Sequence, residues 1–259
     1  MTAETTSEHN FHPEGLTSNQ EKLALMFFDT KTLGKTRRRF QNPDASYRFE
    51  GTSREMAIID FARDEFEFAI TEHIMGKPEA PLAPFFINLR NLSPEVLHQV
   101  GVVLNELVSF FEREGHLPGP DFCAGIPKAG VPIANAYAKI SGIPMVEIFD
   151  KEENSDGTRR ILHKKESGNG ENIRLIDDLV SQGITKLESV REAQEMGYHI
   201  GSFFVLVDRQ QGGIEKLKEV VPDVKAAMTI TQILNFGLRN QRLDKKLYDR
   251  AVSYLLKAT

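Results

Sequence analysis

The order of strands and helices after Pro120 constrains the fold of this chain more than any other feature. Short apolar segments, each long enough for one strand, alternate there with segments of helical periodicity. The apolar segments are 122–126, 145–149, 173–176, 200–207 and 226–231, and the helical ones are 131–140, 185–196 and 244–257. Strands that alternate with helices form a largely parallel sheet covered on both faces. We therefore predict an α/β fold.

The clearest predicted helix precedes this alternating region. Ser93 can cap its first turn, and Pro94 fits the first helical position. Gly115 fits the end of the helix. One continuous apolar stripe lies between these signals and consists of Val96, Leu97, Val100, Val103, Leu104, Leu107, Phe110 and Phe111.

The N-terminal part of the chain gives weaker signals. Residues 1–19 are polar and show no periodic apolar pattern, so we expect a loose tail. Leu23, Met26 and Phe27 recur at helical spacing and predict a short amphipathic helix. The basic stretch 35–40 contains three adjacent arginines, which we interpret as a solvated loop or a partner contact rather than a nucleic-acid site.

A second helix is expected from Thr52 or Ser53, before a connection interrupted by prolines. Its side chains available for burial are Met56, Ile59 and Phe61. The expected domain organisation is a disordered tail over residues 1–19, an N-terminal helical or hood-like region over 20–93, and an α/β core over 94–259.

Composition excludes several classes of protein. The chain has 259 residues and a net charge of -5, which argues against broad binding of nucleic acid or of anionic membranes. Its single cysteine, Cys123, excludes an intrachain disulfide framework and a multi-cysteine zinc site. No apolar run approaches 18 residues, and the first residues lack an apolar signal segment. We therefore expect a cytoplasmic protein with no membrane partner.

Three loops that follow predicted strands carry the candidate chemistry, because ligands of parallel sheets bind beyond the carboxyl ends of the strands. In the first loop, an apolar strand delivers Asp177 and Asp178, and a short turn leads into a helix. Backbone N–H groups of such a turn can hold an anion, with Gly183 allowing close approach and with hydroxyls from Ser181 and Thr185. The two carboxylates suit ribose hydroxyls or a ligand-borne Mg²⁺ ion. Alternatively, Asp178 caps the helix and Asp177 is a solvated strand end.

The second and third loops are also rich in glycine. In segment 124–134, Gly125 and Gly130 with two prolines form a tight turn whose amides can meet a diphosphate, although such glycines also serve strand–helix packing. In the third loop, a buried strand ends in Asp208 and Arg209. The Arg209 guanidinium can bind a planar acidic substrate, or it forms an ion pair with Asp208 at the surface. The glycine motifs of P-loop and dinucleotide-binding proteins are absent from the sequence.

In this order, the three loops resemble those of the type I phosphoribosyltransferases, and of the orotate phosphoribosyltransferase branch in particular. Residues 176–185 resemble the motif that binds phosphoribosyl diphosphate (PRPP), and 125–130 resemble the diphosphate loop. Residues 207–213 are similar to the orotate branch, as is the segment 86–90. The resemblance implies a parallel sheet flanked by helices, with a small N-terminal hood-like region.

The resemblance also implies an activity. Such a glycosyltransferase converts orotate and PRPP to orotidine 5'-phosphate and pyrophosphate with Mg²⁺, in pyrimidine nucleotide synthesis, and acts as a homodimer. Asp177 and Asp178 would hold the ribose hydroxyls and, through PRPP, the Mg²⁺ ion. Arg209 and Ser181 would face orotate, and Lys151 would belong to the catalytic loop. The phosphates of PRPP would be held by Ser181, Gln182, Gly183, Thr185, Lys128, Ala129 and Gly130.

The chain departs from the family pattern where cations are expected. Asn154 and Asp156 replace a lysine and a histidine of the catalytic loop, and Ala129 and Thr71 replace lysines elsewhere. The loss of one such donor costs about 3 kcal/mol of transition-state stabilisation. Basic residues that follow would compensate or would form a solvated hairpin edge; these are Arg159, Arg160, His163, Lys164 and Lys165. The alternatives are a non-catalytic PRPP- or nucleotide-binding regulator of the same fold, or a phosphoribosyltransferase for another base.

Overall fold

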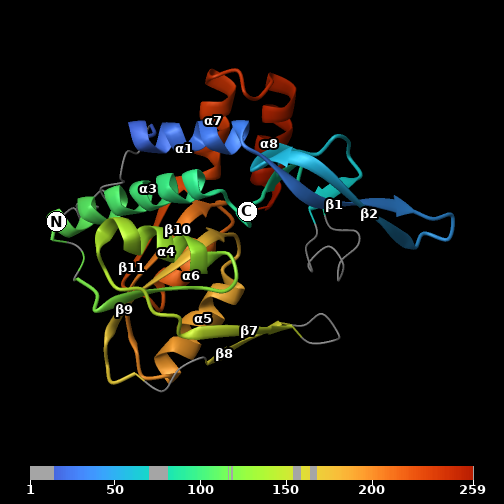
Figure 1. Cartoon of the computed structure of the whole chain (residues 1–259). Coiled ribbons are helices and arrows are strands. Elements are labelled where there is room, and N and C mark those ends of the chain that lie inside the picture. Colours follow the sequence, from blue (N-terminus) through green and yellow to red (C-terminus); the bar gives the residue numbers. More distant parts are fainter. Residues whose placement is uncertain are drawn as a thin grey trace, which may run out of the picture.

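A four-stranded parallel sheet forms the centre of the molecule (Figure 1). The computed structural model describes residues 15–69, 81–115, 117, 119–153, 159–163 and 168–258. The strand order in the sheet is β11–β10–β9–β6. These strands span Phe122–Gly125 (β6), Asn172–Val180 (β9), His199–Asp208 (β10) and Asp223–Thr229 (β11). Because all four run parallel, their carboxyl ends meet at one edge, as the sequence predicts.

Helices cover both faces of this sheet, which confirms the predicted α/β fold. Side chains alternate along β10, so that Phe204 and Leu206 pack on one face and Phe203 and Val205 on the other. The first face carries α1 (Ser18–Asp29), α3 (Pro94–Arg113) and α4 (Gly130–Ser141). The second face carries α5 (Ile184–Glu195) and α6 (Gly213–Lys218).

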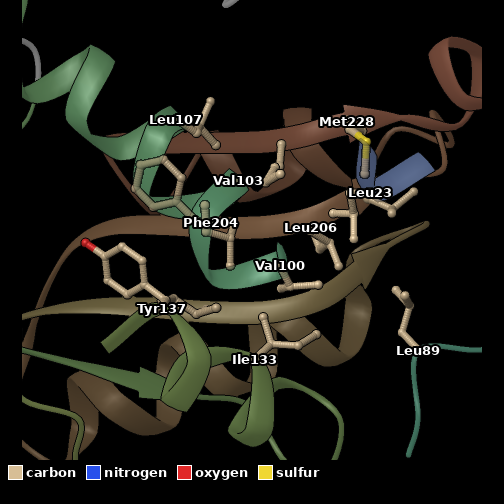
Figure 2. Close-up of a cluster of buried hydrophobic side chains, with 14 of the residues drawn as sticks. Leu23, Leu89, Val100, Val103, Leu107, Ile133, Tyr137, Phe204, Leu206 and Met228 are labelled. Atoms are coloured by element: carbon tan, nitrogen blue, oxygen red, sulfur yellow. The ribbon is translucent and has the colours of Figure 1, made fainter. Parts of the chain in front are cut away.

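The larger core lies between α1, α3, α4 and the sheet (Figure 2). Leu23, Val103 and Leu107 from the helices meet Phe204 and Leu206 from β10, and all five side chains are buried. Burial of each such side chain stabilises the fold by about 1.5–3 kcal/mol. The helix α3 begins where the sequence predicts, because the Ser93 hydroxyl accepts a hydrogen bond from Val96 N (3.4 Å). This cap and the apolar stripe fix α3 against the sheet.

The N-terminal region is mainly β-structure. Strands β1 (Lys31–Gln41), β2 (Tyr47–Ala57) and β4 (Glu67–Ala69) form an antiparallel sheet in the order β2–β1–β4. Strand β3 (Ile59–Phe61) pairs with β5 (Phe85–Ile87). The helix expected from residue 52 is therefore wrong, and the basic stretch 35–40 lies in β1 rather than in a loop.

A largely buried ion-pair cluster explains why the apolar spacing wrongly predicted a helix in this region. The Arg54 guanidinium contacts Asp60 at 2.7 Å and Glu67 at 2.9 Å, and Thr36 Oγ1 donates to Glu67 at 3.0 Å. These contacts join β1, β2, β3 and β4, whereas the pattern of Met56, Ile59 and Phe61 is local. Pairing between distant strands overrides such short-range periodicity.

The remaining elements extend the core and the surface. A hairpin is formed by β7 (Phe149–Glu153) and β8 (Arg159–His163), in the region expected to be a loop or a hairpin. The hairpins β1–β2 and β7–β8 extend from the same side of the molecule (Figure 1). Near the C-terminus, α7 (Ile230–Arg239), which was not predicted, packs against α8 (Lys245–Ala258).

Two other predictions are corrected or completed by the structure. The strand expected over 145–149 is reduced to a single bridge between Met145 and Cys123, with Phe149 opening β7. Residues 1–14 of the expected tail lie outside the described residues, whereas Ser18 already begins α1. Among the described residues, no helix is long and apolar enough to cross a membrane.

Candidate active site

The three candidate loops meet at the carboxyl edge of the central sheet. A Cβ atom on Gly130 would lie 2.7 Å from Ile176 O and 2.8 Å from Asp177 Oδ1. A Cβ atom on Gly213 would lie 2.4 Å from Ser181 O. Real side chains do not approach so closely, so these two positions require glycine. The loops after β6 and β10 therefore both pack directly against the segment that carries the paired aspartates.

The paired aspartates lie inside the end of β9. The predicted strand 173–176 continues to Val180, so that Asp177 and Asp178 belong to it. Asp177 is 2% exposed, and its Oδ1 accepts a hydrogen bond from Asp178 N at 2.8 Å. Asp178 Oδ1 accepts from Leu179 N at 2.7 Å. The residue at the cap of α5 is Gly183, so Asp178 does not cap this helix.

A lysine that the sequence analysis did not single out contacts both carboxylates. Lys186 lies in the first turn of α5, and its Nζ contacts Asp177 Oδ2 and lies 3.7 Å from Asp178 Oδ1. The sequence carried one signal for it, because a lysine in a first turn is disfavoured by the helix dipole unless an anion is near. When both carboxylates are ionised, the ammonium reduces the net charge of the three groups from -2 to -1.

Burial governs the ionisation of this cluster. It raises the pKa of Asp177 to about 7, against the opposing attraction of the Lys186 ammonium. Burial also acts to lower the pKa of Lys186, but attraction to Asp177 and Asp178 outweighs it and raises that pKa above its ordinary value. Lys186 therefore remains a cation at neutral pH.

The turn after β9 presents the start of α5 as an anion site. Gly183 has a φ of 78°, which brings the chain from the strand into the helix. Among the described residues, none accepts a hydrogen bond from the backbone N–H groups of Ile184 or Thr185. The side chains of Gln182, Ile184 and Thr185 are exposed at this turn. The open N–H groups and the helix dipole together favour an anion there.

The loop after β6 lies on the opposite side of the aspartates. Gly130 N donates to Ile126 O at 2.9 Å, and Ile126 N donates to Ile176 O at 3.0 Å, which ties the loop to β9. The Lys128 side chain is exposed, and the peptide bond before it is cis. Ala129 occupies the cap position of α4 and offers no side-chain hydrogen bond. The loop can therefore offer an anion the Lys128 ammonium group and the backbone amides of Lys128 and Ala129, because those of Ile126 and Gly130 are already hydrogen-bonded.

The loop after β10 contributes a partly buried guanidinium whose Nε is shielded from solvent. Arg209 lies 5.4 Å above the Phe85 ring, and among the described residues its Nε has no hydrogen-bond partner. Burial lowers the pKa of Arg209, and a hydrogen bond with Tyr254 opposes this effect. No ion pair joins it to Asp208 within the described part of the chain, so the surface pair considered from the sequence is not formed. Phe85 and Tyr254 gave no sequence signal, because they reach Arg209 only through the fold.

The predicted catalytic loop is described only in part. Lys151 lies on β7, opposite Ile161 of β8. The backbone of Arg159, Arg160 and His163 lies on β8. The positions Thr71, Asn154, Asp156, Lys164 and Lys165 lie outside the described residues.

The side chains available as metal ligands determine how a metal ion would be held at this edge. The described residues contain no cluster of three or more His, Cys, Asp or Glu side chains that could hold a metal ion. Lys186 Nζ also occupies the space between the two carboxylates that a directly bound cation would need. The residues at this edge therefore fit a magnesium ion that arrives on the ligand and is not held by the protein alone.

A separate hollow of about 890 Å³ lies between the N-terminal strands and α8. Arg39, Glu67, Pro84, Arg250 and Tyr254 are among its lining residues. It does not contain the paired aspartates or the glycine turns. We place the chemistry at the sheet edge, because the anion-binding backbone and the carboxylates lie there.

Curated sequence relatives of the chain are orotate phosphoribosyltransferases and a UMP synthase. The chain is 29% identical over 158 residues to orotate phosphoribosyltransferase of Aquifex aeolicus, covering 58% of this chain and 82% of the relative. It is 26% identical over 201 residues to that of Staphylothermus marinus, covering 78% and 94%. It is 26% identical over 175 residues to uridine 5'-monophosphate synthase of Bos taurus, covering 67% of this chain and 35% of that longer protein. No family model matches the chain.

Solved structures show the same fold. UMP synthase of Leishmania donovani aligns with a TM-score of 0.60 and 22% identity, covering 77% of this chain and 40% of that one. Orotate phosphoribosyltransferase of Francisella tularensis aligns with a TM-score of 0.51 and 16% identity, covering 77% and 93%. The molecule therefore has the type I phosphoribosyltransferase fold.

Proposed function

We propose that this chain, a homologue of orotate phosphoribosyltransferases, transfers the phosphoribosyl group of PRPP to orotate. The products would be orotidine 5'-phosphate and pyrophosphate, which makes the protein a glycosyltransferase of pyrimidine nucleotide synthesis. One observation carries the proposal. A carboxylate pair at the end of β9, an open start of α5 and a partly buried guanidinium after β10 occur together at one edge of the sheet.

The segment after β9 would bind the phosphoribosyl group. The carboxylate of Asp178 would accept hydrogen bonds from the ribose hydroxyls. Asp177 is buried and its two oxygens contact Asp178 N and Lys186 Nζ, so it would support Asp178 without contacting the ribose. The 5-phosphate would lie against the turn 181–185, where the open N–H groups of α5 and the Ser181 and Thr185 hydroxyls can donate. Gln182 and Gly183 complete the turn.

The loops after β6 and β10 would bind the two reacting groups. Lys128 and the backbone of Ala129 would hold the diphosphate, and Gly130, whose N–H is engaged by Ile126 O, would line the site without a side chain. Arg209, with Ser181, would hold orotate, because a partly buried guanidinium that has no acidic partner among the described residues is stabilised by a ligand carboxylate. A bond would form between the orotate ring nitrogen and C1 of the ribose as the C1–O bond to diphosphate breaks, and the proton of that nitrogen would be released to solvent.

The diphosphate leaves with the electron pair of the broken bond, so negative charge grows on it. Magnesium carried by PRPP would offset part of this charge, with Asp177 and Asp178 acting on it only through the ligand. Lys128 and, from β7, Lys151 are the cations that this chain would add.

A second candidate is a non-catalytic protein that binds PRPP or a nucleotide. The specific observation in its favour is the contact of Lys186 with both carboxylates, which leaves them less able to act on a ligand. Asn154 and Asp156 in place of loop cations point the same way. A third candidate keeps the transfer reaction and changes the base.

Pyrophosphate release separates these candidates. The wild-type protein with orotate, PRPP and Mg²⁺ should release pyrophosphate, and Asp178→Asn should reduce the rate at least 100-fold, because it removes one charged acceptor at the ribose. PRPP binding without release would favour the non-catalytic protein, and release with another base would favour the third candidate. A wild-type protein that binds neither PRPP nor a nucleotide and releases no pyrophosphate would contradict all three.

We also propose a homodimer and a cytoplasmic location. The dimer rests on the family resemblance, in which a loop of one subunit completes the site of its neighbour. The location rests on the biosynthetic role that we propose.

A further inference from the structure

Lys186 lies where helix formation alone disfavours a lysine. It is the third residue of α5, and a cation in a first turn opposes the helix dipole. Its side chain is only 18% exposed, so the ammonium has also lost most of its contact with water. Only the two carboxylates offset both costs, since Nζ contacts Asp177 Oδ2 and lies near Asp178 Oδ1. The position of Lys186 is therefore explained by the aspartates and not by α5.

The same lysine resolves an electrostatic conflict at this edge. The turn 181–185 offers open N–H groups to a phosphate, yet it directly follows two carboxylates that would repel one. Both oxygens of Asp177 are already engaged, Oδ1 by Asp178 N and Oδ2 by Lys186 Nζ. The ammonium therefore removes about one unit of negative charge beside the anion site without adding a group that occupies the turn.

We propose that Lys186 is an internal counter-ion of Asp177 and Asp178 that lets a phosphorylated sugar bind at the turn 181–185 before any divalent cation is present. This proposal deepens the function proposed above and rests on it. Lys186 is a positioning residue in this account, because it acts through the aspartates and does not touch the ligand. Loss of the Lys186 charge should therefore weaken binding of the sugar phosphate, and removal of a carboxylate charge should restore that binding.

Titration calorimetry of PRPP in the presence of EDTA tests this role. Lys186→Gln keeps a hydrogen-bond donor towards Asp177 but removes the charge, and it should weaken PRPP binding at least tenfold, or about 1.4 kcal/mol. Lys186→Arg, which keeps the charge, should bind within threefold of wild type. The double variant Asp177→Asn with Lys186→Gln should also return to within threefold, because the charge of the cluster is restored. Lys139→Met, at an exposed lysine of α4, is the matched control and should not change binding.

The outcomes are distinct. Unchanged binding in Lys186→Gln would overturn the counter-ion role, and so would a double variant as weak as the single one, since Lys186 would then contact the phosphate itself. A wild-type protein that binds no PRPP with or without Mg²⁺ would instead contradict the proposed function. Thermal melting of each variant shows that folded proteins are compared. If Lys186→Gln is unfolded, the same change in the Asp177→Asn background must alter affinity by less than threefold, and a larger loss would overturn the inference.

Discussion

At the scale of single residues, the site is set by a few charged groups whose surroundings decide their state. Asp208 ends β10 beside Arg209, and burial raises its pKa to about 6, with an opposing hydrogen bond from Gln210 N at 2.7 Å. A carboxyl group whose pKa is raised in the folded state stabilises the fold only while it is protonated. This contribution is complete below about pH 4 and is lost as the pH rises through 6.

Asp208→Asn should therefore be more stable than wild type at pH 8 by about 1–2 kcal/mol, and equally stable near pH 4. The lower figure allows for the partial exposure of the side chain. The asparagine keeps the Oδ1 atom that accepts from Gln210 N, so only the charge changes. Urea unfolding at the two pH values measures the difference. If Asp208→Asn were less stable than wild type at pH 8, the ionised Asp208 would have to be stabilised by Arg209. That result would contradict the structure.

The residues of the site that follow predicted strands could be predicted from the sequence, but their contacts with residues elsewhere in the fold could not. Asp177, Gly183 and Gly130 follow predicted strands, and the structure brings the loops that carry them to one edge. Lys186 was missed because its contact with the aspartates depends on the geometry of the start of α5, which places its side chain beside them. The surroundings of Arg209 were missed because Phe85 and Tyr254 are distant in the chain.

At the scale of elements, the sequence predicted those whose signals are local. The cap at Ser93 and the stripe that follows fixed α3, and the apolar runs of β9 and β10 were found within a few residues of their ends. The strands β1 and β2 were misread because the Arg54 cluster that holds them joins residues from separate strands. Periodicity reports one segment at a time and contains no information on such pairing.

Buried polar contacts between elements also position β9. The Arg174 side chain is fully buried, and it donates to Ser202 Oγ (3.1 Å), Tyr137 OH (2.6 Å) and Glu112 Oε1 (3.0 Å). It thereby connects β9 with β10, α4 and α3. Satisfied networks of this kind are rigid, so the strand that ends in the paired aspartates is fixed to β10 and to the two helices on one face of the sheet.

At the scale of the whole molecule, the proposed homodimer is the open structural question. The hairpins β1–β2 and β7–β8 extend from one side of the body, where a second copy could contact them (Figure 1). We expect sedimentation at micromolar concentration to give about twice the 29.2 kDa mass of the chain. A monomer alone under these conditions would contradict the dimer, while leaving the site within one chain intact.

The central claim is that the edge formed by β6, β9 and β10 binds PRPP. A crystal structure of the protein with PRPP tests it most directly. We predict that the 5-phosphate lies against the N–H groups of Ile184 and Thr185, and the ribose hydroxyls against the carboxylate of Asp178. PRPP bound elsewhere, for example in the hollow beside α8, with the turn 181–185 empty, would contradict it.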